Sequence, residues 1–155
     1  MHIGIIADSH DNVPAVHRML EMFKRIKVDA VLHAGDYIAP FSVEKMIGKK
    51  WQFYGVFGNN DGEREGISQL TQDIEEGPRL IELGGKTFGL VHDRDDWNRD
   101  ECDVLVFGHT HMCYYKKTDS LLEINPGELG GWVSGKSTAA VCNTENLDVE
   151  IIEVM

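Results

Sequence analysis

The sequence predicts an α/β protein in which a β-α-β-α-β half is followed by a β-rich half, packed together as one sandwich. In the first 60 residues, short apolar runs alternate with segments whose apolar residues have helical spacing. After residue 75 helical periodicity nearly disappears, and short apolar runs separated by turn residues follow one another. With 155 residues the chain has the length of one domain, so we expect a single domain over 1–155.

The first predicted unit is a buried strand followed by a helix. The strand is the apolar run Ile3–Ala7, which ends at Asp8. Asn12 can cap the helix, and Pro14 suits its first turn. The inner face of this helix is the apolar stripe Val13, Val16, Leu20 and Phe23. This order is that of a strand that leads into a crossover helix.

The next two strands repeat the pattern. The second strand is Ala30–Leu32, which is followed by Gly35-Asp36. Ser42 is predicted to cap a second helix. Its inner face comprises Val43, Met46 and Ile47. The third strand is Trp51–Phe57, which is followed by Gly58-Asn59-Asn60-Asp61. Crossover helices between these three strands predict a parallel sheet.

The second half is predicted to be mostly β-structure. Arg79–Leu83 and Lys86–His92 flank Gly84-Gly85, which is a strong signal for a two-residue hairpin. The acidic segment Asp93–Asp103 is predicted to be a solvated loop. The remaining predicted strands are Asp103–Phe107, Met112–Lys117, Leu121–Ile124, Thr138–Cys142 and Leu147–Val154.

Charge and composition exclude several classes of function. Fifteen Lys and Arg residues against 26 Asp and Glu give a net charge of −11, which disfavours long nucleic acid and anionic membranes as partners. No apolar run approaches the roughly 18–20 residues that span a bilayer, and Met1–Ile6 does not resemble a secretory signal. The three cysteines are widely spaced and odd in number, as expected for free thiols in the cytoplasm.

Polar residues follow five of the predicted strands, and sites in open α/β sheets form at the carboxyl ends of strands. Each group alone is typical of a turn, a cap or a structural histidine. In an extended segment, the side chains of Asp8 and His10 would share one face, as would those of His109 and His111. The candidate donors taken together are Asp8, His10, Asp36, Asn59, His92, His109 and His111. Mixed imidazole and oxygen donors suit Mn, Fe, Ni, Co or Zn, and seven donors match two ions that share a carboxylate.

The ordered set D-x-H, G-D, G-N-x-D, H and G-H-x-H resembles the calcineurin-like metallophosphoesterase superfamily. The short chain, Gly58–Arg64 and Asn125-Pro126-Gly127-Glu128 look like the small YfcE-type phosphodiesterases of that superfamily. The resemblance implies a four-layer α/β/β/α sandwich of two mixed sheets. It also implies two divalent metal ions and the hydrolysis of small phosphate diesters by a hydroxide that bridges them.

The resemblance assigns a role to each donor. The first metal would be held by Asp8, His10 and His111. The second metal would be held by Asn59, His92 and His109. Asp36 would bridge the two ions, and Asn59 and Asn60 would bind and orient the phosphate. Asp36, Asn59 and Asn60 are therefore also the catalytic candidates.

Three features depart from the family pattern. Asn60 stands where many relatives have a histidine that protonates the leaving group, and an amide cannot transfer a proton. Asp93 replaces the usual glycine, and the stretch between His92 and Gly108 is shorter than in relatives that carry a helix there. We therefore expect a preference for good leaving groups and a reshaped rim, to which Trp97 is a candidate contributor.

Two other functions fit the same residues. One is a metal-dependent phosphomonoesterase or nucleotidase. The other is a non-catalytic protein-binding scaffold, because the vacuolar sorting subunit of retromer has this fold. All seven ligand positions hold competent donors here, which favours the enzyme. The sequence is compatible with a homo-oligomer as well as with a monomer.

Overall fold

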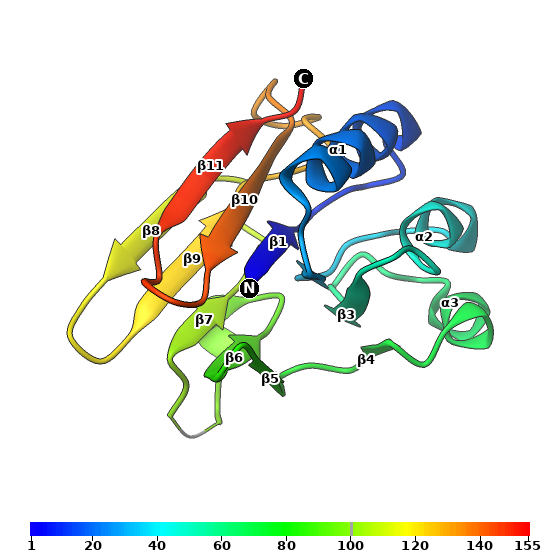
Figure 1. Cartoon of the computed structure of the whole chain (residues 1–155). Coiled ribbons are helices and arrows are strands. Elements are labelled where there is room, and N and C mark those ends of the chain that lie inside the picture. Colours follow the sequence, from blue (N-terminus) through cyan, green and yellow to red (C-terminus); the bar gives the residue numbers. More distant parts are fainter. Residues whose placement is uncertain (100) are drawn as a thin grey trace.

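The computed structural model describes residues 1–99 and 101–155; Asp100, in the predicted acidic loop, lies outside the described residues. Two β-sheets pack face to face, and three α-helices lie on the side of the first sheet (Figure 1). The elements are β1 (His2–Ile6), α1 (Val13–Ile26), β2 (Ala30–His33), α2 (Pro40–Met46), β3 (Gln52–Val56), α3 (Arg64–Leu70), β4 (Ile74–Glu75), β5 (Arg79–Leu83), β6 (Lys86–Leu90), the 3-10 turn η1 (Arg94–Asp96), β7 (Val104–Val106), β8 (Cys113–Lys117), β9 (Leu122–Pro126), β10 (Thr138–Asn143) and β11 (Val149–Glu153).

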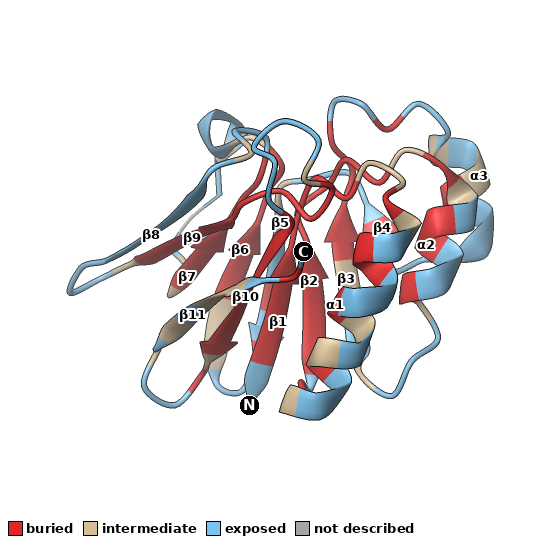
Figure 2. Ribbon diagram, turned by 90° about the horizontal axis from the view of Figure 1, so that it is seen from above, coloured by how far each residue is buried: buried red, intermediate tan, exposed pale blue. Residues whose placement is uncertain are grey.

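The first sheet has the strand order β11-β10-β1-β2-β3-β4. Strands β1 to β4 are parallel, whereas β10 pairs antiparallel with both β1 and β11. As predicted, Asn12 caps α1, and its side chain accepts a hydrogen bond of 3.2 Å from the backbone N–H of Ala15. The predicted stripe packs toward the sheet through Val16 and Phe23. The helices are buried on the sheet side and exposed on the other (Figure 2).

The second sheet has the order β5-β6-β7-β9-β8. The predicted Gly84-Gly85 hairpin joins β5 to β6, and both glycines have positive φ (57° and 75°), as a type I′ turn requires. In β7, Val104 and Val106 face the core between the sheets, whereas Leu105 faces outward because side chains alternate along a strand. The edge strand β8 is exposed along its length (Figure 2).

The outer face of the second sheet carries little helix. In the described part of the chain, the segment between β6 and β7 contains only the single 3-10 turn η1. Trp97 packs against Gly89, where any side chain would collide with the indole, and it adjoins a cluster formed by Val91, Leu105 and Phe107. The predicted sandwich of two mixed sheets is confirmed, and among the described residues this face of the second sheet carries a short turn and one indole but no α-helix.

One local prediction was wrong, and two short elements were not predicted. Ser42 does not cap α2; the helix begins at Pro40, whose fixed φ suits a first helical position. The Ser42 hydroxyl instead donates to the Asp11 carboxylate at 2.6 Å. Helix α3 was not predicted because Ile67 is its only buried residue, which leaves no periodic signal. Strand β4 was missed because it is only two residues long.

Over the described residues, the structure has no helix that is both long enough and apolar enough to cross a membrane.

Candidate metal centre

The predicted site residues gather at the carboxyl ends of strands from both sheets. Asp8 and His10 follow β1, Asp36 follows β2 and Asn59 follows β3. From the second sheet, His92 follows β6, and His109 and His111 follow β7. Backbone bonds join these loops: the Asp8 N–H donates to Gly35 (2.9 Å), and the His109 N–H donates to an Asp8 carboxylate oxygen (3.0 Å). The structure therefore brings all seven predicted donors together.

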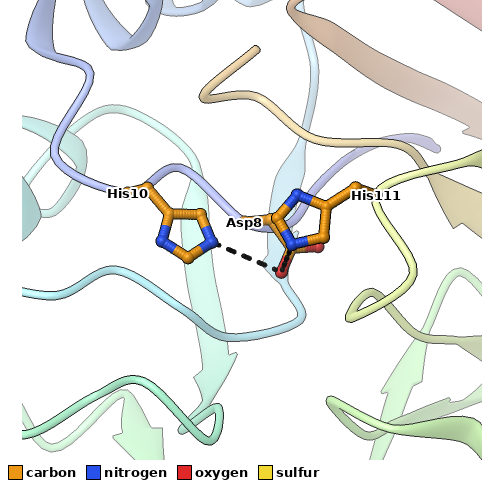
Figure 3. A group of neighbouring side chains, drawn as sticks. All are labelled: Asp8, His10 and His111. Atoms are coloured by element: carbon orange, nitrogen blue, oxygen red, sulfur yellow. Dashed lines mark ion pairs between the residues drawn. The ribbon is translucent and has the colours of Figure 1, made fainter. Parts of the chain in front are cut away.

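Asp8, His10 and His111 form one group of three donors (Figure 3). The Nε2 atoms of His10 and His111 lie 3.9 and 3.8 Å from Oδ1 of Asp8. The two imidazole rings stack with their centroids 5.3 Å apart. Two ring nitrogens thus converge on one carboxylate oxygen that lies buried between them.

Asp36 lies between this group and the remaining donors. Its Oδ2 is 3.5 Å from Nε2 of His10, and its Oδ1 is 3.6 Å from Nε2 of His92. Asp8, Asp36 and His92 have ligand atoms within 4.8 Å of one another. Each oxygen of the Asp36 carboxylate therefore faces a histidine from a different part of the site.

Asn59, His92 and His109 complete the cluster. Oδ1 of Asn59 lies 2.8 Å from Nε2 of His92 and 3.1 Å from Nδ1 of His109. Nδ1 of His92 donates to the carbonyl of Ala34 at 2.7 Å, which fixes the ring with Nε2 directed into the site. Asp93 lies beside this group, with Oδ2 3.5 Å from Nε2 of His109.

Asn60 lies against Asp36. Its backbone N–H donates to Oδ1 of Asp36 at 2.9 Å, and its side-chain amide donates to Oδ2 at 2.7 Å. The rest of the residue is exposed. An amide nitrogen carries two hydrogens, so one donor remains for another acceptor.

The extended conformation considered for the Asp8–His10 and His109–His111 pairs was wrong, and Asp36 also has a positive φ. Asp8, His10 and Asp36 have φ values of 49°, 40° and 61°, and His109 and His111 have 66° and 61°. These are left-handed conformations, which are uncommon for residues other than glycine and cluster at functional sites. The two donor pairs therefore converge through tight turns rather than through the alternation of an extended chain.

The electrostatics of the site favour the binding of a cation. Burial raises the pKa of Asp8 to about 7, and the nearby Asp36 carboxylate adds to the rise, although His111 opposes it. Burial lowers the pKa of His10. Among the described residues, three buried side-chain atoms have no hydrogen-bond partner, and two of them are Oδ1 of Asp8 and Nε2 of His10. Such orphaned groups are costly, and a cation between them would satisfy both, so these residues fit a metal ion.

Asp61 supports the site and was not predicted to do so. Its buried carboxylate accepts four backbone N–H groups, from Asp36 (3.0 Å), Tyr37 (2.7 Å), Ile38 (2.9 Å) and Gly58 (2.7 Å). It thereby ties the loop after β2 to the loop after β3. The G-N-x-D pattern includes Asp61, but the sequence alone gives no sign of its partners.

Glu128 and His33 are two further supporting residues. The Glu128 carboxylate accepts a hydrogen bond of 3.0 Å from Nδ1 of His111 and others from Val133 and Ser134. His33 is fully buried; it accepts from the Gly35 N–H at 3.1 Å and lies 3.0 Å from the Ser9 hydroxyl. Glu128 could have been found from the sequence, because it ends the Asn125–Glu128 segment that carries part of the family resemblance.

Trp97 was predicted to contribute to the rim of the site. It packs instead on the outer face of the second sheet.

Comparison with known proteins places this arrangement in a family. The calcineurin-like phosphoesterase superfamily domain matches residues 1–147. The chain is 30% identical over 156 residues to phosphodiesterase MJ0936 of Methanocaldococcus jannaschii, with 94% of each chain covered. It is 26% identical over 149 residues to phosphodiesterase YfcE of Escherichia coli, covering 83% of this chain and 79% of that one.

Solved structures agree with these matches. An archaeal phosphodiesterase superposes with a TM-score of 0.85 at 27% identity, over 99% of both chains. The E. coli YfcE phosphoesterase gives a TM-score of 0.76 at 18% identity over the whole of both chains, and this second likeness concerns the fold alone. The chain therefore belongs to the calcineurin-like phosphoesterase superfamily and is a phosphoric ester hydrolase of that family.

Proposed function

We propose that this protein is a phosphodiesterase that binds two divalent metal ions and hydrolyses small phosphate diesters. The observation that carries the proposal is the convergence of seven donors around two buried, unpartnered atoms, Oδ1 of Asp8 and Nε2 of His10. The relatives named above as phosphodiesterases support the choice of a diester. The net charge of −11 disfavours a long nucleic acid, whose many phosphates the surface would repel.

The geometry suggests how the donors divide between the two ions. Asp8, His10 and His111 would hold the first, and Asn59, His92 and His109 would hold the second. Asp36 would be shared, since its two oxygens face His10 and His92. Imidazole with carboxylate and amide oxygens suits Mn, Ni, Fe, Co or Zn. The free thiols of Cys102, Cys113 and Cys142 support a reducing compartment, which we propose is the cytoplasm.

When bound, divalent metal ions would supply an activated water and stabilise negative charge on the phosphate. The chain's own residues orient the donors. His111 donates from Nδ1 to Glu128, and His92 donates from Nδ1 to Ala34, so both rings present Nε2 to the site. The second amide hydrogen of Asn60 is available to a phosphate oxygen. Because Asn60 donates hydrogen bonds but gives up no proton, the leaving group departs without general-acid help from this position.

The test is an assay of metal-stripped protein reloaded with Mn²⁺ or Ni²⁺. We expect metal-dependent hydrolysis of bis(p-nitrophenyl) phosphate to exceed that of p-nitrophenyl phosphate. Faster turnover of the monoester would favour a phosphomonoesterase or nucleotidase instead. If neither ester is hydrolysed although metal binds, and a partner protein binds tightly, the non-catalytic scaffold is the better description.

Metal binding should stabilise the fold. Adding Mn²⁺ to metal-stripped protein, at about 100 times the dissociation constant, is expected to raise the melting temperature by about 5 °C or more, because the ion binds only the folded state. Differential scanning calorimetry measures the shift. His111→Ala should remove most of it, whereas His17→Ala, at an exposed position of α1, should leave it unchanged. An equal shift in both variants would place the metal elsewhere.

Replacing Asn60 should change the preference for leaving groups. Asn60→His is expected to raise kcat/KM about 10-fold or more for alkyl diesters with poor leaving groups, because an imidazolium beside Asp36 can donate a proton. Activated aryl diesters should gain little, since their leaving groups need no proton. Asn60→Gln, which keeps an amide, is the control. No gain for alkyl diesters in Asn60→His would show that the missing histidine does not limit the reaction.

A further inference from the structure

Trp132 stands exposed beside the proposed metal centre. The residue is 67% exposed, whereas tryptophan in folded proteins is mostly buried. Its indole Nε1–H donates to the backbone carbonyl of His10 at 3.1 Å. A large apolar ring is thus held in a fixed place next to a candidate metal ligand, although it contributes little to the protein core.

The loop that carries Trp132 is anchored along its length. The N–H groups of Leu129 and Gly130 donate to the carbonyls of Ala7 and Asp8, each at 2.9 Å. The side chain of Asn12 donates to the Gly130 carbonyl at 2.7 Å, and the Glu128 carboxylate accepts the Val133 N–H at 2.9 Å. The bonds of Leu129 and Gly130 hold this loop against the turn that contains Asp8 and His10, and the bond from Val133 to Glu128 closes the loop beyond Trp132. The exposure of the indole is therefore a property of a fixed loop.

The two ends of the site differ in polarity. The end formed by His92 and His109 is lined by Asn59 and Asp93, and Asn60 lies between the two ends, against Asp36. At the other end, next to His10 and His111, the chain exposes three large apolar residues. These are Trp132 (67% exposed), Val133 (75%) and Met112 (69%), the last of which directly follows His111. A phosphodiester has two ester groups, so such a site can receive a polar group at one end and an apolar group at the other.

We propose that Trp132 binds a flat aromatic ester group of the substrate, so that the natural substrates are small phosphodiesters with one aromatic substituent. This inference rests on the proposed phosphodiesterase function and specifies the substrate of the same site. Stacking of a flat ring on an exposed, immobilised indole contributes binding without demanding one particular hydrogen-bond pattern. An aromatic ester group is also consistent with an amide at Asn60, because aromatic alcohols are better leaving groups than alkyl alcohols when no proton is donated.

The test compares two inhibitors that differ only in the group proposed to contact Trp132, which is phenyl in one and methyl in the other. Monomethyl phenylphosphonate and monomethyl methylphosphonate are titrated calorimetrically into Mn²⁺-loaded protein, and their inhibition of bis(p-nitrophenyl) phosphate hydrolysis is measured. The phenyl compound should bind about 10- to 100-fold more tightly. Trp132→Leu should remove most of this preference without changing the affinity for the methyl compound or the Mn²⁺-induced rise in melting temperature. Trp132→Phe should keep much of the preference, and Tyr115→Leu, at an exposed aromatic position on β8, should keep all of it.

The outcomes separate this inference from the function on which it rests. If the wild type hydrolyses diesters but binds both phosphonates equally, or if Trp132→Leu keeps the phenyl preference, the aromatic subsite is overturned and the phosphodiesterase stands. If the wild type hydrolyses no diester and binds neither phosphonate, the proposed function fails, and the subsite fails with it.

Discussion

Asp8→Asn is expected to abolish metal-dependent hydrolysis while making the metal-free protein more stable. Activity should fall by about three orders of magnitude or more, because the variant loses the carboxylate on which His10 and His111 converge. The stability effect has the opposite sign. Oδ1 of Asp8 is buried without a partner, and burial raises the pKa of this group to about 7. A neutral amide removes that buried charge, for a gain on the order of 2 kcal/mol at pH 8.

Two measurements on one sample check this prediction. Urea unfolding of metal-stripped protein at pH 8 gives the free energy of unfolding, and steady-state assay with Mn²⁺ gives kcat/KM. Asp119→Asn, the same change in the exposed turn between β8 and β9, should alter neither quantity. A variant that is both inactive and less stable than the wild type would mean that Asp8 is a structural carboxylate, and the case for a cation at this position would be lost.

The sequence predicted most of the fold because its signals are local. The apolar run that ends at Asp8, the cap at Asn12 and the Gly84-Gly85 turn each act over a few residues, and the structure has each of them. The errors arose where a short element depends on distant contacts. Ser42 has the right chemistry for a cap, but its hydroxyl bonds Asp11, which lies 31 residues away in the sequence.

The same distinction separates the predicted site residues from those that were missed. The donors could be listed because each follows a strand, and the carboxyl ends of strands meet at one place. The positive φ values of Asp8 and His111 could not be predicted, because tertiary contacts impose them on residues that rarely adopt them. Trp132 could not be placed either, since its bond to the His10 carbonyl spans 122 residues of sequence.

Asp61→Asn should destabilise the fold more than any other conservative substitution proposed for this site. Oδ1 of Asp61 accepts the N–H groups of Tyr37 and Ile38, and Oδ2 accepts those of Asp36 and Gly58. In asparagine, one of these oxygens becomes an NH₂ group, which would face two N–H donors. At least two buried hydrogen bonds to a charged acceptor are lost, and two backbone donors are left unpaired. A decrease of about 3 kcal/mol in the free energy of unfolding is expected.

The loss of these hydrogen bonds in Asp61→Asn should also affect the metal centre, because Asp61 binds the backbone of the loops that carry the metal ligands. The loops that Asp61 joins carry Asp36 and Asn59, so loosening them should weaken Mn²⁺ binding as well as stability. Urea unfolding and calorimetric Mn²⁺ titration of the same variant measure the two effects. Asp29→Asn is the matched control, because the exposed Asp29 carboxylate accepts one backbone N–H, from His2 at 2.8 Å, and its loss should cost less than about 1 kcal/mol. If Asp61→Asn lost stability but bound Mn²⁺ with unchanged affinity, Asp61 would support the fold without positioning the ligands. Equal losses of unfolding free energy in the two variants would show that the four backbone hydrogen bonds to Asp61 stabilise the fold no more than the single one to Asp29.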